Sequence, residues 1–233
     1  MKMKERTLVR SYSSDFPAEE QPISEGGMWL NGKKDGVDWA DVYTRPGLVY
    51  GGPTRMENAE FRAEQGNAEE TGTAAAGDYD DPTAVLSGEW GPDQHGRGVV
   101  HSVNPTDEWF QEVQIRLRSS IEPHSCSGYE VFFRALKSDA AYAEIVRWNG
   151  AIGDWTSLER HEGSEYGVEH GDVIEATIEG ALIRGFINGK EVISVEDDRI
   201  ADGAPGVGFN FGVGDTGPDT GFSSFEVNTY AAE

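Results

Sequence analysis

Cysteine is nearly absent from this sequence of 233 residues, and long apolar runs are absent altogether. The single Cys126 excludes an intramolecular disulfide, so noncovalent packing has to hold the fold together. Its neighbours His124 and Ser125 leave a catalytic or metal-binding pair open, although a lone cysteine is more often a small buried residue. No stretch of 18 apolar residues occurs, and no apolar run follows the basic N-terminus, so we expect neither a membrane span nor a secretion signal.

Basic residues are also scarce, lysine above all. The 42 Asp and Glu outnumber the 19 Lys and Arg, of which only six are lysine, and the formal net charge is -23. Such a chain repels a phosphate backbone, so nucleic acid is excluded as a partner. An acidic surface poor in lysine stays hydrated where salt screens charge strongly, which predicts a halophilic source. An ordinary acidic surface is the alternative.

Amphipathic helical periodicity is missing as well, whereas strand patterns are frequent. In residues 110–118, Val113, Ile115 and Leu117 alternate with polar residues, which predicts a half-buried strand whose polar side chains face solvent. Thirty glycines suit short strands that are joined by many turns. The sequence therefore predicts an all-β protein, a two-sheet antiparallel jelly-roll sandwich.

The length fits a single domain, because β-sandwiches of this size are common. We expect residues 1–12 to form an N-terminal arm or a first strand, and residues 13–233 to form the sandwich. Between about 53 and 82, glutamates mix with Ala, Gly, Thr and Asn without apolar periodicity. This composition predicts an acidic surface loop, with a short helix around 57–65 as the alternative.

The last third of the chain contains the clearest hairpin. Asn188-Gly189 follows the β-prone run 182–187, and this pair favours the two-residue turn in which both residues have positive φ. Gly203 and Gly206 then suit a bend into a return strand. Together these segments predict the closing part of an antiparallel sandwich.

Short motifs along most of the chain resemble those of one large family. They are Asp15-Phe16, Gly27-Met28-Trp29, Asp93-Gln94, Gly128-Tyr129-Glu130, Arg147-Trp148-Asn149-Gly150, the segment 187–192, Asp198, and the segments 203–208 and 221–227. On these residues the sequence resembles the concanavalin A-like lectin and glucanase sandwiches, in particular their laminin-G-like bacterial and phage modules. The resemblance implies the jelly-roll fold but names no ligand, since one fold hosts many functions.

Two tryptophans in one turn are candidates for sugar binding. Indoles stack on the apolar faces of sugar rings, while sugar hydroxyls need amide and carboxylate partners. Trp148 and Trp155, with Asn149 and Asp154 between them, supply both kinds of group. The alternative is that the two indoles pack in the core, as large aromatic side chains in sandwiches usually do.

Catalytic patterns are incomplete. The glucanases of this family carry a Glu-x-Asp-x-x-Glu string on one strand, and no such string occurs here; Glu196-Asp197-Asp198 is the nearest acidic cluster. Polysaccharide lyases on related folds use Arg, Gln, His and Tyr on one sheet face, and the candidates for that arrangement are Gln114, Arg116, Arg118, His101 and Tyr129. Solvated side chains on the outer face of a sheet are the alternative.

Carboxylates in loops are candidate metal ligands, because carboxylate oxygens suit hard cations such as calcium. Asp215 and Asp219 lie in one candidate loop, and Asp78, Asp80 and Asp81 lie in another. Neither loop has the spacing of a twelve-residue calcium loop, so solvated acidic loops are the alternative. No two histidines have the spacing of a zinc-binding helix pair.

These observations favour a non-catalytic, lectin-like module that binds a glycan or a cell-surface polysaccharide and is displayed on a virion or an extracellular surface after synthesis in the cytoplasm. A carbohydrate-active enzyme, either a polysaccharide lyase or a hydrolase, is one alternative. A purely structural capsid or tail component is another, and in that case the arm 1–12 would contact protein partners. Calcium is the only cofactor that the sequence suggests.

Overall fold

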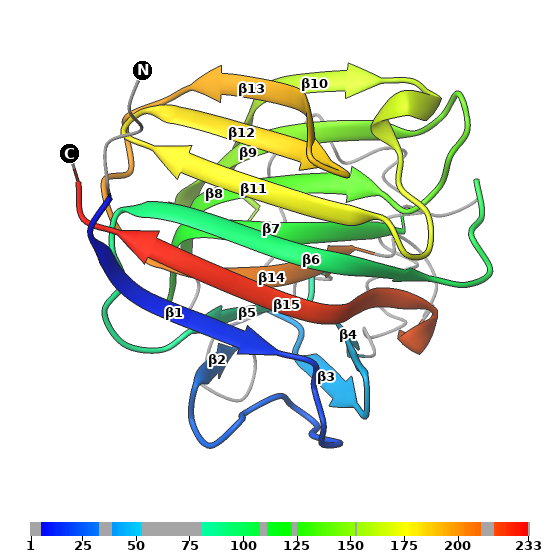
Figure 1. Cartoon of the computed structure of the whole chain (residues 1–233), viewed down its shortest axis with the longest axis horizontal. Coiled ribbons are helices and arrows are strands. Elements are labelled where there is room, and N and C mark those ends of the chain that lie inside the picture. Colours follow the sequence, from blue (N-terminus) through cyan, green and yellow to red (C-terminus); the bar gives the residue numbers. More distant parts are fainter. Residues whose placement is uncertain are drawn as a thin grey trace.

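The fold is described from a computed structural model. The described residues are 6–32, 39–52, 81–107, 111–122, 125–151, 153–210 and 217–232. They form two antiparallel sheets that lie one in front of the other (Figure 1), so the predicted all-β sandwich is confirmed. Helical structure in these ranges amounts to the 3-10 turns Ser164–Tyr166 and Gly217–Asp219. None of the described segments is a helix that could span a membrane.

The eight-stranded sheet has the order β13-β12-β11-β6-β15-β4-β3. The eighth strand, β1, pairs with the C-terminal part of β15, beyond the residues that pair with β4. Its strands come from both ends of the chain, because β15 lies between β6 on one side and β1 and β4 on the other. The strands are β1 (Leu8–Ser14), β3 (Val42–Arg45), β4 (Leu48–Gly51), β6 (Asp93–Ser102), β11 (Val173–Glu179), β12 (Leu182–Ile187), β13 (Lys190–Glu196) and β15 (Thr220–Tyr230).

The seven-stranded sheet has the order β10-β9-β8-β7-β14-β5-β2. Four of these strands, β7 to β10, follow one another as a meander, and β14 joins them from the end of the chain. The strands are β2 (Trp29–Asn31), β5 (Thr83–Leu86), β7 (Glu112–Glu122), β8 (Ser125–Arg134), β9 (Tyr142–Ala151), β10 (Trp155–Glu162) and β14 (Ala204–Asn210).

The main core fills the space between the two sheets. Val113, Ile115 and Leu117 of β7 point into it, and so do Ile174, Ala176 and Ile178 of β11. Alternate residues of each strand thus share one face, as the period of two in the sequence predicted. Burial of this apolar surface is the main force that holds the two sheets together.

The Asn188-Gly189 turn joins β12 to β13 as predicted. Ile187 is paired with Lys190, and the two turn residues have φ angles of 52° and 76°. Asn188 also accepts a hydrogen bond from the Val173 amide and donates one to Asp172, so the turn is fixed to the start of β11. The turn chemistry therefore sets the register of this edge of the sheet.

The prediction that β7 is half-buried is wrong. Gln114, Arg116 and Arg118 are 1%, 0% and 4% exposed, so the polar residues of this strand are as deeply buried as the apolar ones. Three strands, β2, β3 and β10, lie in segments whose sequence does not predict a strand. Of the predicted acidic loop, residues 53–80 lie outside the described residues, together with the alternative helix, while Asp81 is buried.

Candidate functional site

The outer face of the seven-stranded sheet carries a buried cluster of charges, which we call the charged face. It consists of Asp81, Gln114, Arg116, Glu130 and Trp148. Arg116 of β7 lies directly opposite Glu130 of β8, and both point away from the core between the sheets because residues paired across antiparallel strands share a face. The sequence had placed these residues in separate motifs, and strand pairing brings them together.

Arg116 is the centre of the charged face. Its Nη1 lies 3.0 Å from Glu130 Oε2, and its Nη2 lies 3.2 Å from Asp81 Oδ2 and 2.9 Å from the Thr83 hydroxyl. The guanidinium also lies 5.3 Å from the ring centre of Trp148. A fully buried cation is compensated here by two carboxylates, as burial of charge requires.

Glu130 receives hydrogen bonds in this cluster and is itself 2% exposed. Burial raises the pKa of its carboxyl group to about 7, although the positive charge of Arg116 opposes the shift. The Trp148 indole donates to Glu130 Oε2 at 2.7 Å. Burial therefore favours the protonated form of the Glu130 carboxyl group, whereas the charge of Arg116 favours the ionised form.

Trp148 does not offer a stacking surface. It is 3% exposed, its ring meets Trp39 edge-to-face at 4.8 Å, and its N–H is used by Glu130. The Trp148 indole is therefore a packing residue, which was the alternative to sugar stacking. Trp155 lies opposite Trp148 on β10 and is half-buried against the same cluster, so part of its ring faces solvent.

Asn149 and Asp154 close the β9–β10 hairpin. The Asn149 amide donates to the Asp154 carboxylate at 2.9 Å and to the Thr156 hydroxyl at 3.0 Å, and its oxygen accepts from Arg147. Both residues are exposed. The hairpin thus presents a polar, internally bonded turn beside the half-buried Trp155.

The predicted lyase arrangement is not formed. Gln114 and Arg116 lie on the charged face, whereas Tyr129 points into the core between the sheets and His101 belongs to the other sheet. Tyr129 donates to Asp197 at 2.6 Å, and burial raises its pKa to about 12. Because these four side chains face different spaces, they cannot act on one sugar ring.

Further carboxylates extend the charged face along β7 and β9. Glu144 of β9 accepts hydrogen bonds from Ser157 at 2.5 Å and from Arg160 at 2.6 Å, and Glu112 of β7 is bonded to the Tyr142 hydroxyl. The Arg160 guanidinium also stacks on the Tyr142 ring at 3.9 Å. The face is therefore most exposed towards β10, where Arg160 reaches solvent.

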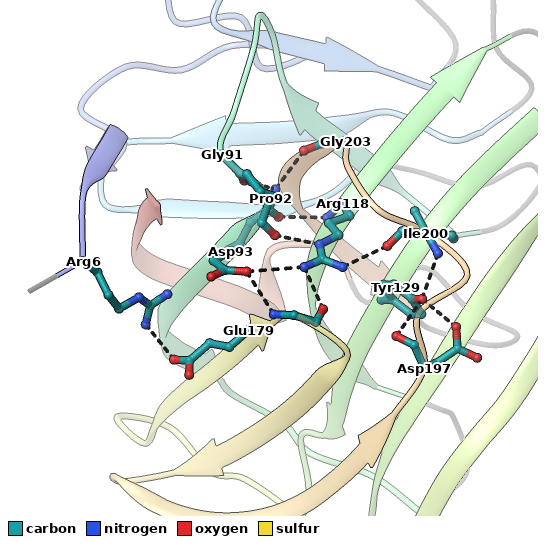
Figure 2. Close-up of polar contacts among 12 residues, drawn as sticks. Arg6, Gly91, Pro92, Asp93, Arg118, Tyr129, Glu179, Asp197, Ile200 and Gly203 are labelled. Carbon is teal, nitrogen blue, oxygen red and sulfur yellow. Dashed lines mark hydrogen bonds and ion pairs between the residues drawn. The ribbon is translucent and has the colours of Figure 1, made fainter. Parts of the chain in front are cut away.

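Arg118 is the centre of a second buried hydrogen-bond network, which the sequence did not predict (Figure 2). It donates to the carbonyl oxygens of Pro92, Gly180 and Ile200 at 2.6, 2.9 and 2.9 Å, and lies 3.6 Å from Asp93. Its φ of 45° is unusual for a non-glycine residue and marks a break in the β7–β8 register. Nothing in the local sequence distinguishes Arg118 from its neighbours, because its three acceptors come from distant segments.

The remaining candidates do not gather into a metal site. Asp219 binds the Asn104 amide at 2.9 Å, and Asp215, Asp78 and Asp80 lie outside the described residues. No group of three His, Cys, Asp or Glu suited to a metal occurs in the described part of the chain. Calcium binding stays a prediction.

Cys126 is a buried free thiol in the cluster of Trp39 and Trp148. Burial raises its pKa to about 12, so the reactive thiolate is not populated near neutral pH. A catalytic role for this cysteine therefore has no support.

Comparisons with known proteins agree with the fold. No protein-family model matches the sequence, and no curated protein does. Among solved structures, the carbohydrate binding module CBM66 from Bacillus subtilis has a TM-score of 0.53 at 11% identity, over 91% of this chain and 98% of that chain.

Two further structures are similar with lower scores. The VIP36 exoplasmic/lumenal domain in its Ca2+/Man2-bound form has a TM-score of 0.48 at 11% identity, over 66% of this chain and 73% of that chain. The beta-porphyranase BpGH16B from the human gut bacterium Bacteroides plebeius has a TM-score of 0.46 at 8% identity, over 94% and 89%. Such identities indicate the fold alone, and that fold is the concanavalin A-like sandwich that the sequence motifs predicted.

Proposed function

We propose that this protein is a lectin-like module that binds a glycan or cell-surface polysaccharide at the edge formed by the β9–β10 hairpin. The observation that carries the proposal is the agreement of the whole fold with a carbohydrate binding module, over nearly the full length of both chains. The fold provides the frame, and the hairpin provides groups of the kind that sugars require.

The argument for the hairpin rests on Trp155 and its surroundings. Its ring is partly exposed, and its cross-strand neighbour Trp148 is fixed by the Glu130 hydrogen bond, so the indole packs against a rigid support. The exposed Asn149 and Asp154 lie in the turn that leads into Trp155. A sugar that stacks on the indole would meet amide and carboxylate groups at its edge.

Substitution of Trp155 tests this site. We expect Trp155→Ala to lower polysaccharide affinity by at least about tenfold, because the stacking surface is removed, while the free energy of unfolding falls by only about 1 kcal/mol. Glycan arrays and calorimetry measure the first quantity, and urea unfolding measures the second. Tyr43→Ala is the matched control, since Tyr43 is a partly exposed aromatic residue on the opposite, β3 edge of the other sheet. Equal affinities of the two variants would remove Trp155 from the site.

A glycoside hydrolase is a second candidate, because two carboxyl groups lie on one face of neighbouring strands and burial raises the pKa of one of them, Glu130, in the direction that a general acid needs. Glu144 lies one strand away on the same face, diagonal to Glu130 in the register. Incubation with a polysaccharide panel, followed by assay of new reducing ends, tests this function. Activity that is abolished in Glu130→Gln supports it, and the absence of product from every polymer contradicts it.

The setting of the module is a further part of the proposal. The excess of carboxylates supports a protein that works in high salt, and display on a virion or cell surface fits a glycan-binding role. We expect the unfolding midpoint to rise between low and molar NaCl, as measured by thermal unfolding. An unfolding midpoint that does not depend on salt would contradict the proposal that the protein comes from a halophilic source.

A further inference from the structure

A pocket of about 370 Å³ lies at the end of the sandwich where β6 and β8 end. We call it the end pocket. Its volume falls within the range of about 300 to 1,000 Å³ that is usual for ligand sites. The register of β8 and β9 places the β9–β10 hairpin at the other end of these strands, so the pocket and the hairpin edge are separate. The lining residues are Ser102, Pro105, Ala135, Leu136, Lys137, Val168, Glu169 and His170.

The walls of the end pocket are built by a close approach of two chain segments. The Val168 amide donates to the Arg134 carbonyl at 2.9 Å. A Cβ atom at Gly167 would lie 1.9 Å from the Leu136 carbonyl oxygen, so only glycine allows the segments to meet there. Leu136, which is partly exposed, and the exposed Pro105 then supply an apolar wall, while Val168 is buried in the core behind it; such a wall suits the C–H face of a sugar ring.

The polar side of the end pocket carries a lysine between two carboxylates. Lys137 Nζ lies 3.1 Å from Glu169 Oε1 and 3.0 Å from Asp172 Oδ2. Although burial opposes it, hydrogen bonds from Asn188, the Glu169 amide and Lys137 hold the pKa of Asp172 below its ordinary value. The ammonium charge is therefore already compensated by ionised groups, which disfavours an anionic ligand. A metal ion would have to displace the ammonium group.

His170 adds a donor at the rim. Its Nδ1 accepts the Ser102 amide proton at 3.4 Å, which places the proton of the neutral ring on Nε2. His101 packs edge-to-face against the same ring, with centroids 5.2 Å apart, and fixes its orientation. The rim thus combines a carboxylate acceptor on Glu169 with ammonium and imidazole donors. Neighbouring hydroxyl groups, each a donor and an acceptor, match this set.

We propose that the end pocket is a carbohydrate site separate from the hairpin edge, and that it takes one neutral sugar unit through two vicinal hydroxyl groups. Glu169 accepts hydrogen bonds from the diol, Lys137 and His170 donate to it, and the wall of Leu136 and Pro105 contacts the ring. This site goes beyond the function proposed above, because neither Trp155 nor the charged face takes part in it.

Amide chemical shifts of the full-length, 15N-labelled protein test the proposal. The probes are the methyl glycosides of glucose, galactose, mannose and fructose, with inorganic phosphate as the anionic comparison. We expect at least one glycoside to shift the amides of Ser102, Lys137 and His170 at millimolar concentration, while phosphate shifts none of them. Shifts confined to other regions, or larger shifts of these amides with phosphate, would overturn it.

A pair of exposed glutamates provides matched variants. Glu169→Gln keeps the shape of the side chain and should weaken glycoside binding by about tenfold, whereas Glu191→Gln on β13 should leave it unchanged. Equal affinities of the two variants overturn the proposal. Trp155→Ala should preserve the shifts at the end pocket. A chain that loses polysaccharide binding in Trp155→Ala, but binds glycosides as before, therefore separates the two sites.

Discussion

The outer faces of the two sheets differ although their strands have similar patterns. On the eight-stranded sheet, Arg97 pairs with Glu226 at 3.5 Å, and the two side chains are 36% and 47% exposed. On the seven-stranded sheet, Arg116 pairs with Glu130 at 3.0 Å, and these side chains are 0% and 2% exposed. The alternation of residues thus shows which side chains share a face, but it does not show whether that face meets water.

The difference matters because the two ion pairs have different energetics. An exposed pair exchanges solvation by water for a weak, screened attraction and contributes little to stability. A buried pair has lost its solvation, so removal of one partner leaves an uncompensated charge in a medium of low polarity. Substitutions on the two faces can therefore test the comparison directly.

The largest effect is expected for Arg116→Met. Loss of the guanidinium leaves Glu130 and Asp81 without their cation, and we expect the free energy of unfolding to fall by about 3 to 5 kcal/mol. Arg97→Met on the exposed face should change it by less than about 1 kcal/mol. Urea unfolding of both variants measures the two values. Similar losses in both would show that burial does not separate the two faces.

The pH dependence of stability should also differ between the faces. The pKa of Glu130 is raised by burial to about 7, above its ordinary value of 4.5, so the native state holds a proton that the unfolded state releases in this range. The free energy of unfolding should therefore fall as the pH rises from about 4.5 to 7, by up to about 3 kcal/mol from this group.

Glu130→Gln removes this contribution, and the slope of stability against pH should become less negative in the same window. Glu226→Gln on the exposed face is the control and should leave the slope as it is. Chemical unfolding at a series of pH values provides the curves. The prediction is wrong if the wild type and Glu130→Gln give parallel curves.

A smaller loss is expected for Arg118→Met, where the buried guanidinium faces carbonyl oxygens more than carboxylates. Its removal deprives the carbonyl oxygens of Pro92, Gly180 and Ile200 of a charged donor, but Gly180 is exposed and the other two residues are only partly buried, so we expect water to replace part of this bonding. We expect a loss of about 2 kcal/mol, with faster hydrogen exchange in residues 197–203. A loss as large as that of Arg116→Met would show that the acceptor type does not matter.

Much of the fold could be predicted because its signals are local. Asn188-Gly189 specifies a two-residue turn by its own backbone preference, and alternation in residues 113–117 specifies a strand. The short β2 and β3 and the polar β10 were missed, because each depends on pairing with a neighbour for its stability. The motifs indicated the sandwich fold through these same local signals.

The candidate sites were less predictable. Trp148 and Trp155 are close in sequence and lie opposite each other, yet one is buried and the other is partly exposed. The end pocket combines Ser102, Lys137 and His170 from three separate segments, and no local pattern in the sequence groups them. A site of this kind arises only when distant strand ends meet.

The sequence by itself determined the class of fold, the antiparallel hairpins and the acidic, nearly cysteine-free character of the chain, because turn chemistry, side-chain period and charge are properties of neighbouring residues. Only the tertiary structure decided that the polar side of β7 is buried, that Arg116 is enclosed by Asp81 and Glu130, and that a pocket forms beside Lys137. Burial and the pairing of charges depend on segments far apart in the chain, which no local pattern records.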